Sequence, residues 1–142
     1  MRRIDRTRAG IERKLADFAG NWRLERKISQ ADGTRAVFLG QADWQPKDDG
    51  LLCVEIGVLT LPGQAQMQAE RRYFWSEDLS VYFDDGRFFH KVPALGGETG
   101  HWCDPDQYDG CYDFGDWPVF RVTWRVKGPK KDYKMISAYE RE

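Results

Sequence analysis

The 142-residue sequence has few of the residues that bind metals or form disulfide bridges: two histidines and three cysteines. Three cysteines cannot all pair within one chain, and the basic N-terminus lacks the apolar centre of a secretion signal, so we expect reduced thiols and a cytoplasmic protein. The chain also lacks an apolar run near the ~20 residues that a membrane helix needs. Its formal net charge of −1 brings no excess of positive charge. We therefore expect neither nucleic acid nor a membrane as a partner.

Aromatic residues are abundant by contrast, at 14% with six tryptophans, and the strand pattern is strong. Ile11, Leu15 and Phe18 recur at helical spacing and predict a helix over 8–19. After residue 20 the pattern changes to short segments of period two, or of continuous apolar character, separated by turns. They cover residues 22–28, 36–44, 51–59, 67–75, 79–83, 87–92, 101–103, 107–114, 119–126 and 133–141.

The connections between these segments are nearly all hairpin-length, which favours an antiparallel up-and-down β-barrel over a Greek key. Closure into a barrel also removes the exposed edges that so many apolar strands would otherwise leave. We therefore predict an all-β fold of about ten strands in a single domain over 1–142, with the barrel spanning 21–142.

The stretch "DFAGNW", which ends at Trp22, resembles the entry motif of calycins, the lipocalin-like and fatty-acid-binding-like barrels. That resemblance implies that Trp22 plugs one barrel end and packs under a late-strand arginine, either Arg125 or Arg141. Four further motifs resemble an uncharacterised bacterial family of this class, domain-of-unknown-function family 6314. They are "RRYFW", "FDDGRFFH", "H-x-C-x-P-D-x-Y" and "GPKKDY". The resemblance implies a fold and supplies no activity, cofactor or site residue.

The stretch "HWCDPDQYDGCY", residues 101–112, holds many reactive side chains. His101 and Cys103 share a strand face, and His90, Asp104 and Asp106 are further candidate metal ligands. The spacing matches no established metal motif, and two histidines are a small supply of ligands. We therefore predict a β-hairpin without a metal, with Cys103 and Cys111 reduced.

Three arginines lie on predicted apolar strand faces: Arg26, Arg71 and Arg141. If these faces point inward, each guanidinium needs an anion, and Glu55 or a ligand carboxylate can supply one. Alternatively, Arg26 and Arg141 lie near strand ends and reach water. The "GPKKDY" segment is read as a turn with solvated lysines, although Lys130 and Lys131 at a barrel mouth can also attract an anion.

The expected function is the binding of a small, amphipathic, anionic organic molecule inside the barrel. Tyr139 and Arg141 loosely resemble, in reversed order, an arrangement found in fatty-acid-binding barrels. The predicted ligand-binding residues are Arg71, Tyr73, Trp75, His90, His101, Tyr108, Tyr112, Tyr133, Tyr139 and Arg141.

Three alternatives remain open at this point. An enzyme can use the same cavity, with His90 or His101 as base and Tyr108 or Tyr112 as acid. A filled barrel can act as an interaction module. Haem can bind through His90 or His101, as in some lipocalin-like barrels, although no cofactor is expected. A homodimer is compatible with each alternative.

Overall fold

The structure is a computed structural model that describes residues 10–142. A short 3₁₀ helix, η1 (Leu15–Phe18), precedes ten strands. The strands are β1 (Gly20–Gln30), β2 (Arg35–Lys47), β3 (Gly50–Thr60), β4 (Met67–Trp75), β5 (Ser80–Phe83), β6 (Phe88–Lys91), β7 (Gly97–Cys103), β8 (Asp106–Asp116), β9 (Val119–Lys127) and β10 (Asp132–Arg141).

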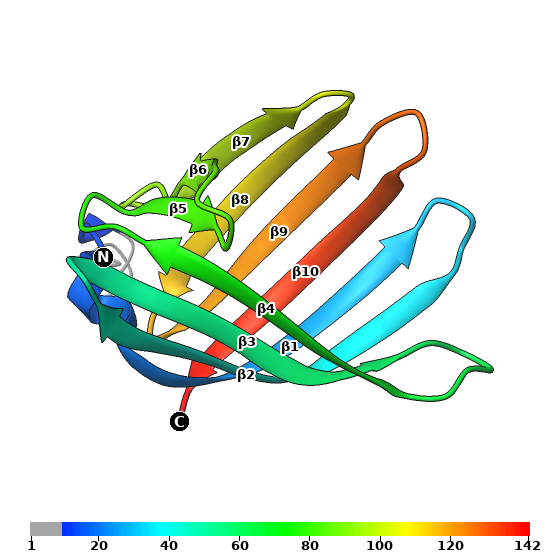
Figure 1. The fold of residues 1–142 in the computed structure, drawn as a ribbon, viewed down its shortest axis with the longest axis horizontal. Helices are drawn as coiled ribbons and strands as arrows, with labels where there is room; N and C mark the ends of the chain where they lie inside the picture. Colours follow the sequence, from blue (N-terminus) through cyan, green and yellow to red (C-terminus); the bar gives the residue numbers. More distant parts are fainter. Residues whose placement is uncertain (1–9) are drawn as a thin grey trace, which may run out of the picture.

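All ten strands form one antiparallel sheet in the order β6-β5-β4-β3-β2-β1-β10-β9-β8-β7 (Figure 1). The predicted all-β, up-and-down barrel is therefore confirmed. The sheet curls until its edges, β6 and β7, approach each other, and Thr99 Oγ1 on β7 donates to the Lys91 carbonyl on β6 at 2.8 Å. The barrel is nearly closed, because these two strands meet through this side-chain contact and share no sheet ladder.

Strict alternation along the strands places one face of each strand inside the barrel. On β1, Trp22, Leu24 and Arg26 are buried while their neighbours Arg23 and Glu25 are exposed. Successive side chains of a strand point to opposite faces, so this pattern identifies the inner face directly. The same parity buries Ser137 and Tyr139 on β10. The cross-strand pairs Ala42–Glu55 and Glu55–Arg71 continue the inner face from β2 to β4, so the strand register places Arg71 on the same face as Trp22.

Gly40 on β2 and Gly57 on β3 are paired directly across the two strands, where the backbones approach closely. A Cβ atom on Gly40 would lie 2.1 Å from the Ile56 carbonyl oxygen, and one on Gly57 would lie 2.3 Å from the Leu39 carbonyl oxygen. Only glycine fits such an approach. The Phe38 ring takes up space beside Gly57, its Cζ atom 2.8 Å from where that Cβ would stand.

One end of the barrel is sealed by a cluster of aromatic rings, here called the plug cluster. Its members are Phe18, Trp22, Trp44, Trp75, Phe114, Trp117 and Phe120, with neighbouring ring centroids 5.1–6.5 Å apart. In Figure 1 this end lies where the N-terminal segment packs against the sheet, opposite the hairpin turns β1–β2, β3–β4, β7–β8 and β9–β10.

Trp22 is the fully buried centre of the plug cluster, and its Nε1 donates to the Phe18 carbonyl at 2.8 Å. The Arg141 guanidinium lies 4.2 Å from the centroid of the Trp22 ring. It also donates to the Ala19 carbonyl at 2.7 Å and to the Asp17 carbonyl. Of the two arginines considered for this position, Arg141 is the partner of Trp22, and Arg125 instead pairs with Asp132 at 2.7 Å.

The structure differs from the sequence-based expectation in two segments. Within the described part of the predicted helix 8–19, residue 10 and η1 (Leu15–Phe18) are helical, whereas residues 11–14 are not, and residues 8 and 9 lie outside the described chain. The Arg13 amide donates instead to the Ala94 carbonyl at 2.8 Å, which holds this segment extended over the plug end. Strand β7 begins at Gly97, four residues before the predicted segment 101–103, because its backbone pairs with β8 from there on. Across residues 10–142, none of the helices has the length and apolar character needed to span a bilayer.

Candidate ligand-binding site

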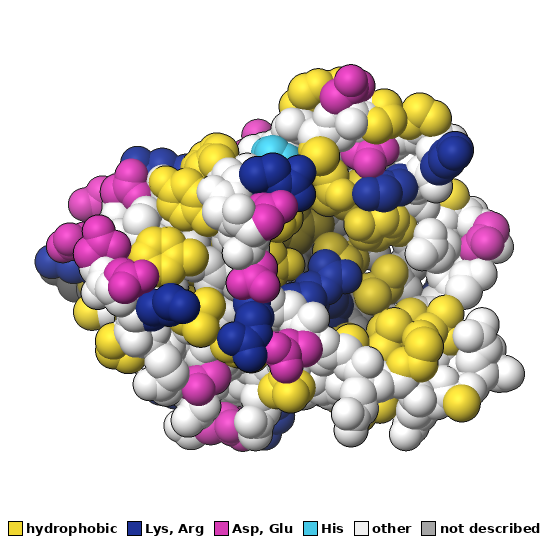
Figure 2. All heavy atoms as spheres, viewed as in Figure 1, with side chains coloured by type: hydrophobic (Ala, Val, Ile, Leu, Met, Phe, Trp, Pro, Cys, Tyr) yellow, Lys and Arg dark blue, Asp and Glu magenta, His cyan; other side chains and the backbone are white. Residues whose placement is uncertain are grey.

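A cavity of about 130 Å³ lies inside the barrel beside the plug cluster. Figure 2 shows a recess on this side of the molecule, with hydrophobic side chains inside it and Lys or Arg side chains at its edge. Eight of the ten predicted ligand-binding residues line the cavity: Arg71, Tyr73, Trp75, His90, Tyr108, Tyr112, Tyr133 and Tyr139. These eight residues come from four strands, β4, β6, β8 and β10, and the full lining draws on nine of the ten strands.

His101 and Arg141, the other two predicted residues, are not part of the lining. His101 lies on the inner face of β7, opposite Tyr108, but it packs edge-on against Phe83 and Phe89, at centroid distances of 5.9 and 5.4 Å. Those two rings belong to the lining, so His101 contacts residues of the cavity wall without lining the cavity itself. Arg141 lies over Trp22 at the sealed end, and its guanidinium donates hydrogen bonds to the backbone carbonyls of Asp17 and Ala19.

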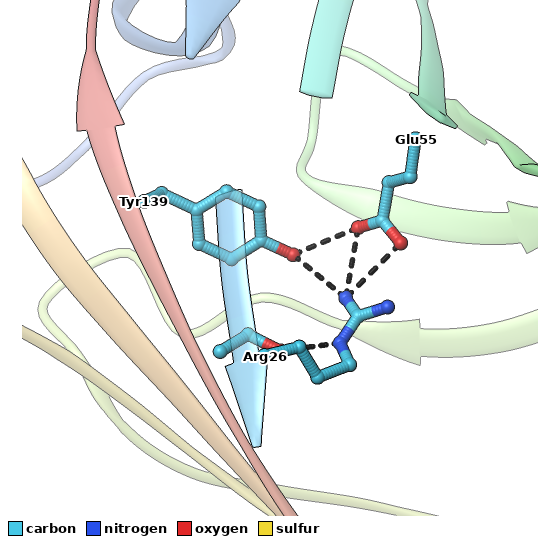
Figure 3. Close-up of polar contacts among 4 residues, drawn as sticks. Arg26, Glu55 and Tyr139 are labelled. Carbon is cyan, nitrogen blue, oxygen red and sulfur yellow. Dashed lines mark hydrogen bonds and ion pairs between the residues drawn. The ribbon is translucent and has the colours of Figure 1, made fainter. Parts of the chain in front are cut away.

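One wall of the cavity carries a buried polar network centred on Arg26 (Figure 3). Arg26 Nη2 lies 3.0 Å from Glu55 Oε1 and donates to Glu55 Oε2 at 3.1 Å. Arg26 Nε donates to Ser137 Oγ at 2.7 Å, and the Tyr139 hydroxyl donates to Glu55 Oε2 at 2.8 Å. Of the alternatives left open by the sequence, Glu55 is the anion that pairs with Arg26, and Arg26 is buried and does not reach water at a strand end.

This network is electrostatically matched. Burial is the largest single effect and lowers the pKa of Arg26, but Glu55, Tyr139 and Tyr73 together outweigh it, and the net effect raises the pKa. Burial, and then the negative charge of Glu55, raises the pKa of Tyr139 well above its usual value. Arg26 therefore stays charged and Tyr139 stays neutral, and the Glu55 side chain pairs with the guanidinium within the network.

Arg71 differs from Arg26 although both arginines are close to Glu55. Arg71 is the direct cross-strand partner of Glu55, on β4. Among residues 10–142 it forms no ion pair with a carboxylate, because Glu55 is taken by Arg26. Burial and the charge of Glu55 raise the pKa of Tyr73, and the charge of Arg71 opposes this. Arg71 is exposed at the edge of the cavity, with phenol groups beside it.

A second cation, Lys131, stands at the open end and is already held by the protein. Its Nζ lies 3.1 Å from Asp106 Oδ2 and 3.3 Å from the hydroxyl of Tyr108. These hydrogen bonds, first that to Tyr108 and then that to Asp106, raise the pKa of Lys131. Lys131 therefore helps to position Tyr108 in the cavity wall, and its charge is largely compensated by Asp106.

His90 and Tyr112 form the second polar group of the cavity wall. His90 Nε2 and the Tyr112 hydroxyl are 2.8 Å apart, and both side chains are buried. Burial, with a smaller contribution from His101, lowers the pKa of His90 to about 3. Burial also raises the pKa of Tyr112 well above its ordinary value. Both groups are therefore neutral near neutral pH, and His90 Nδ1 has no hydrogen-bond partner among the described residues.

The candidate metal ligands do not come together as a cluster. Across residues 10–142, no group of three or more His, Cys, Asp or Glu side chains has the geometry to hold a metal ion. Residues 101–112 do form the predicted hairpin of β7 and β8. On it Cys103 faces inward opposite Asp106, and Cys111 lies on the outer face opposite Glu98, so the two thiols point to opposite sides and are free.

Sequence reasoning missed several apolar members of the lining. They include Trp44, Cys53, Phe83, Phe89, Val122, Trp124 and Met135. Strand parity was readable for Trp44, Val122, Trp124 and Met135. It was not readable for Cys53, whose segment is apolar on both faces, or for Phe89, whose neighbour His90 also lines the cavity. The signal that was missing is the tilt of the strands, which decides which inward residues reach the same level of the barrel.

Comparisons with known proteins support the fold. The profile of a family of unknown function (DUF6314) matches residues 18–141. The S-type phycobiliprotein lyase CPES from Guillardia theta is similar in structure, with a TM-score of 0.62, 8% identity and coverage of 90% of each chain. A designed fluorescence-activating β-barrel matches with a TM-score of 0.43 and 12% identity, over 90% of this chain and 96% of that chain. No curated protein sequence matches this chain.

Proposed function

This chain belongs to the family of unknown function DUF6314, and we propose that it binds a small amphipathic organic anion in its barrel. One observation carries the proposal. Arg71 is a cation on the cavity lining that has no carboxylate partner in residues 10–142, whereas Arg26, its neighbour across Glu55, is fully matched. A ligand acid group can take the place of that partner, held by the guanidinium through paired hydrogen bonds.

The surroundings of Arg71 suit the rest of such a ligand. The cavity wall presents aromatic rings, among them Tyr73, Phe89 and Trp124. Rings supply a large apolar contact area at little conformational cost, and the tyrosine hydroxyls add orientation. Because Arg71 is exposed at the cavity edge, the charged end of a bound ligand can stay near water while its apolar end enters the barrel. The fold similarity to a phycobiliprotein lyase is consistent with a barrel that handles small molecules.

The alternatives are less well supported by the geometry. A cavity of about 130 Å³ argues against a completely filled barrel. It is also far below the 300–1,000 Å³ of typical ligand pockets, so it does not enclose a macrocycle such as haem. An acid–base enzyme would need a base with a pKa near neutrality, whereas the pKa of His90 is about 3.

The test compares Arg71→Gln with Arg72→Gln. These arginines are adjacent on β4 and face opposite sides, and Arg72 is exposed and paired with Glu70 at 2.6 Å. Binding of benzoate, octanoate and decanoate is measured by calorimetry and by tryptophan fluorescence. We expect at least one acid to bind, with Arg71→Gln weakening it about tenfold or more and Arg72→Gln leaving it unchanged.

Thermal unfolding of both variants provides the control for folding. Arg71 is exposed and forms no ion pair in residues 10–142, so its replacement should leave the unfolding midpoint close to that of the parent protein. If no organic acid binds, or if Arg71→Gln and Arg72→Gln weaken binding equally, the proposed role of Arg71 is wrong.

A further inference from the structure

Two buried ring nitrogens on the cavity lining lack a hydrogen-bond partner among residues 10–142. They are Nδ1 of His90, a side chain that is only 3% exposed, and Nε1 of Trp44. A buried polar atom without a partner costs about 1–3 kcal/mol, so native proteins rarely leave one unexplained. Here two such atoms belong to the wall of the same hollow, and a ligand that enters it can satisfy them.

The shape of the hollow restricts that ligand. Its volume of about 130 Å³ is close to that of an apolar cavity of ~150 Å³ known to hold one benzene molecule. The wall rings stand at several angles: Phe89 stacks on Trp124 with centroids 5.0 Å apart, and His90 meets Trp124 edge-on at 4.8 Å. Such walls favour a flat ring over an extended chain, because rings gain from both stacked and edge-on contacts.

The polar groups of the hollow restrict the ligand further. His90 and Tyr112 are neutral partners 2.8 Å apart. The unpaired charge of the described lining residues, that of Arg71, lies at the exposed edge of the cavity. If Tyr112 donates to Nε2, then Nδ1 carries the proton and seeks an acceptor. If Nε2 donates to Tyr112, then Nδ1 is itself an acceptor. A hydroxyl group matches both tautomers because it donates and accepts, and its oxygen can also accept from an indole N–H such as that of Trp44.

We propose that the ligand is a monocyclic hydroxylated aromatic acid, whose ring fills the cavity and whose hydroxyl group hydrogen-bonds His90 Nδ1. This inference rests on the proposed function for the acid group, which Arg71 holds at the cavity edge. It adds the identity of the buried end: one flat ring with a neutral polar substituent.

The test is a series of probes measured on the unaltered protein by calorimetry: benzoate, 3-hydroxybenzoate, 4-hydroxybenzoate, phenol and decanoate. Both hydroxybenzoates are used because the substituent position must match the spacing from Arg71 to His90. We expect one of them to bind about three- to tenfold more tightly than benzoate, which is the worth of one hydrogen bond to an otherwise unpaired group. Decanoate should bind more weakly than either.

The variant His90→Phe/Tyr112→Phe removes the polar pair together, so that neither partner is left unpaired. It should reduce the preference for the hydroxybenzoate over benzoate to less than twofold. The matched control is His101→Gln, which alters a histidine behind the lining and should retain the preference. If the double variant does not fold, as judged by circular dichroism, the probe series on the unaltered protein still decides.

The outcomes separate this inference from the proposal on which it rests. Benzoate binding as tightly as both hydroxybenzoates, or decanoate binding best, would overturn the ring-and-hydroxyl inference and leave the anion-binding function standing. Phenol binding without any acid would support the hydroxyl contact at His90 and overturn the role of Arg71. Binding of none of the five probes would overturn both.

Discussion

The plug cluster and the cavity occupy the same inner surface of the barrel, yet one is a sealed core and the other a hollow. At the centre of the plug cluster, polar groups are paired with backbone: Trp22 Nε1 with the Phe18 carbonyl, and Arg141 with the carbonyls of Asp17 and Ala19. On the cavity lining, Nδ1 of His90 and Nε1 of Trp44, a plug-cluster residue that borders the cavity, have no partner in the described chain. The difference teaches that aromatic content alone does not distinguish a core from a binding site, and that unpaired ring nitrogens mark where the plug cluster meets the hollow.

Arg26 and Arg71 repeat the comparison on a smaller scale. Both lie close to Glu55 on β3. Arg26 extends from β1, and Arg71 lies on β4, the strand that pairs with β3. Arg26 is buried and takes the carboxylate, so Arg71 is left at the cavity edge with phenol groups as its neighbours. One carboxylate between two arginines thus produces a structural ion pair and a free cation.

The largest expected effect is at the sealed end. Trp22→Ala removes the fully buried centre of the plug cluster and should lower the free energy of unfolding by about 3–5 kcal/mol, the usual cost of truncating a buried large ring. Urea unfolding followed by circular dichroism measures it. The control, Trp102→Ala, truncates a side chain that is 59% exposed and should change stability by less than about 0.5 kcal/mol. Equal losses in the two variants would contradict the assignment of Trp22 as the plug.

The next effect concerns the buried ion pair. Glu55→Leu leaves Arg26 buried without an anion and should cost about 3 kcal/mol. We place it at the lower end of the range for such variants because the neighbouring cavity can admit water. The double variant Arg26→Met/Glu55→Leu should recover at least half of that loss, since no uncompensated charge remains. Additive losses in the double variant would show that the two residues act independently.

The smallest effect is the pH dependence due to His90. Its pKa is about 3 in the folded protein and near 6.5 when exposed. Between these values the unfolded chain binds a proton that the folded chain does not, so the free energy of unfolding falls as the pH falls, by up to about 1.4 kcal/mol per pH unit. Urea unfolding at pH 7, 6, 5 and 4 should show this slope reduced in His90→Phe/Tyr112→Phe. In His101→Gln, which keeps His90, the slope should persist; a double variant with an unchanged slope would contradict the buried neutral state of His90.

Much of the architecture was predictable from residue patterns. The alternation in β1 and β10, the short connection between the segments 79–83 and 87–92 and the Gly-x-Trp entry at Trp22 each depend on neighbours within one or two strands. Such local signals survive in a single sequence because period-two burial and turn geometry leave their mark on adjacent residues. The segment before Leu15 was predicted less well. The Arg13 amide donates a hydrogen bond to the distant Ala94 carbonyl, and this long-range bond outweighs the helical spacing of the apolar residues.

The sequence by itself determined the number of strands, their antiparallel up-and-down order and eight of the residues that line the cavity. Only the tertiary structure decided that Glu55 pairs with Arg26 and not Arg71, that His90 and not His101 faces the hollow, and that Arg141 covers Trp22. The physical reason is geometric: alternation is a property of one strand, but contact between inward side chains depends on the tilt and stagger of strands around the barrel.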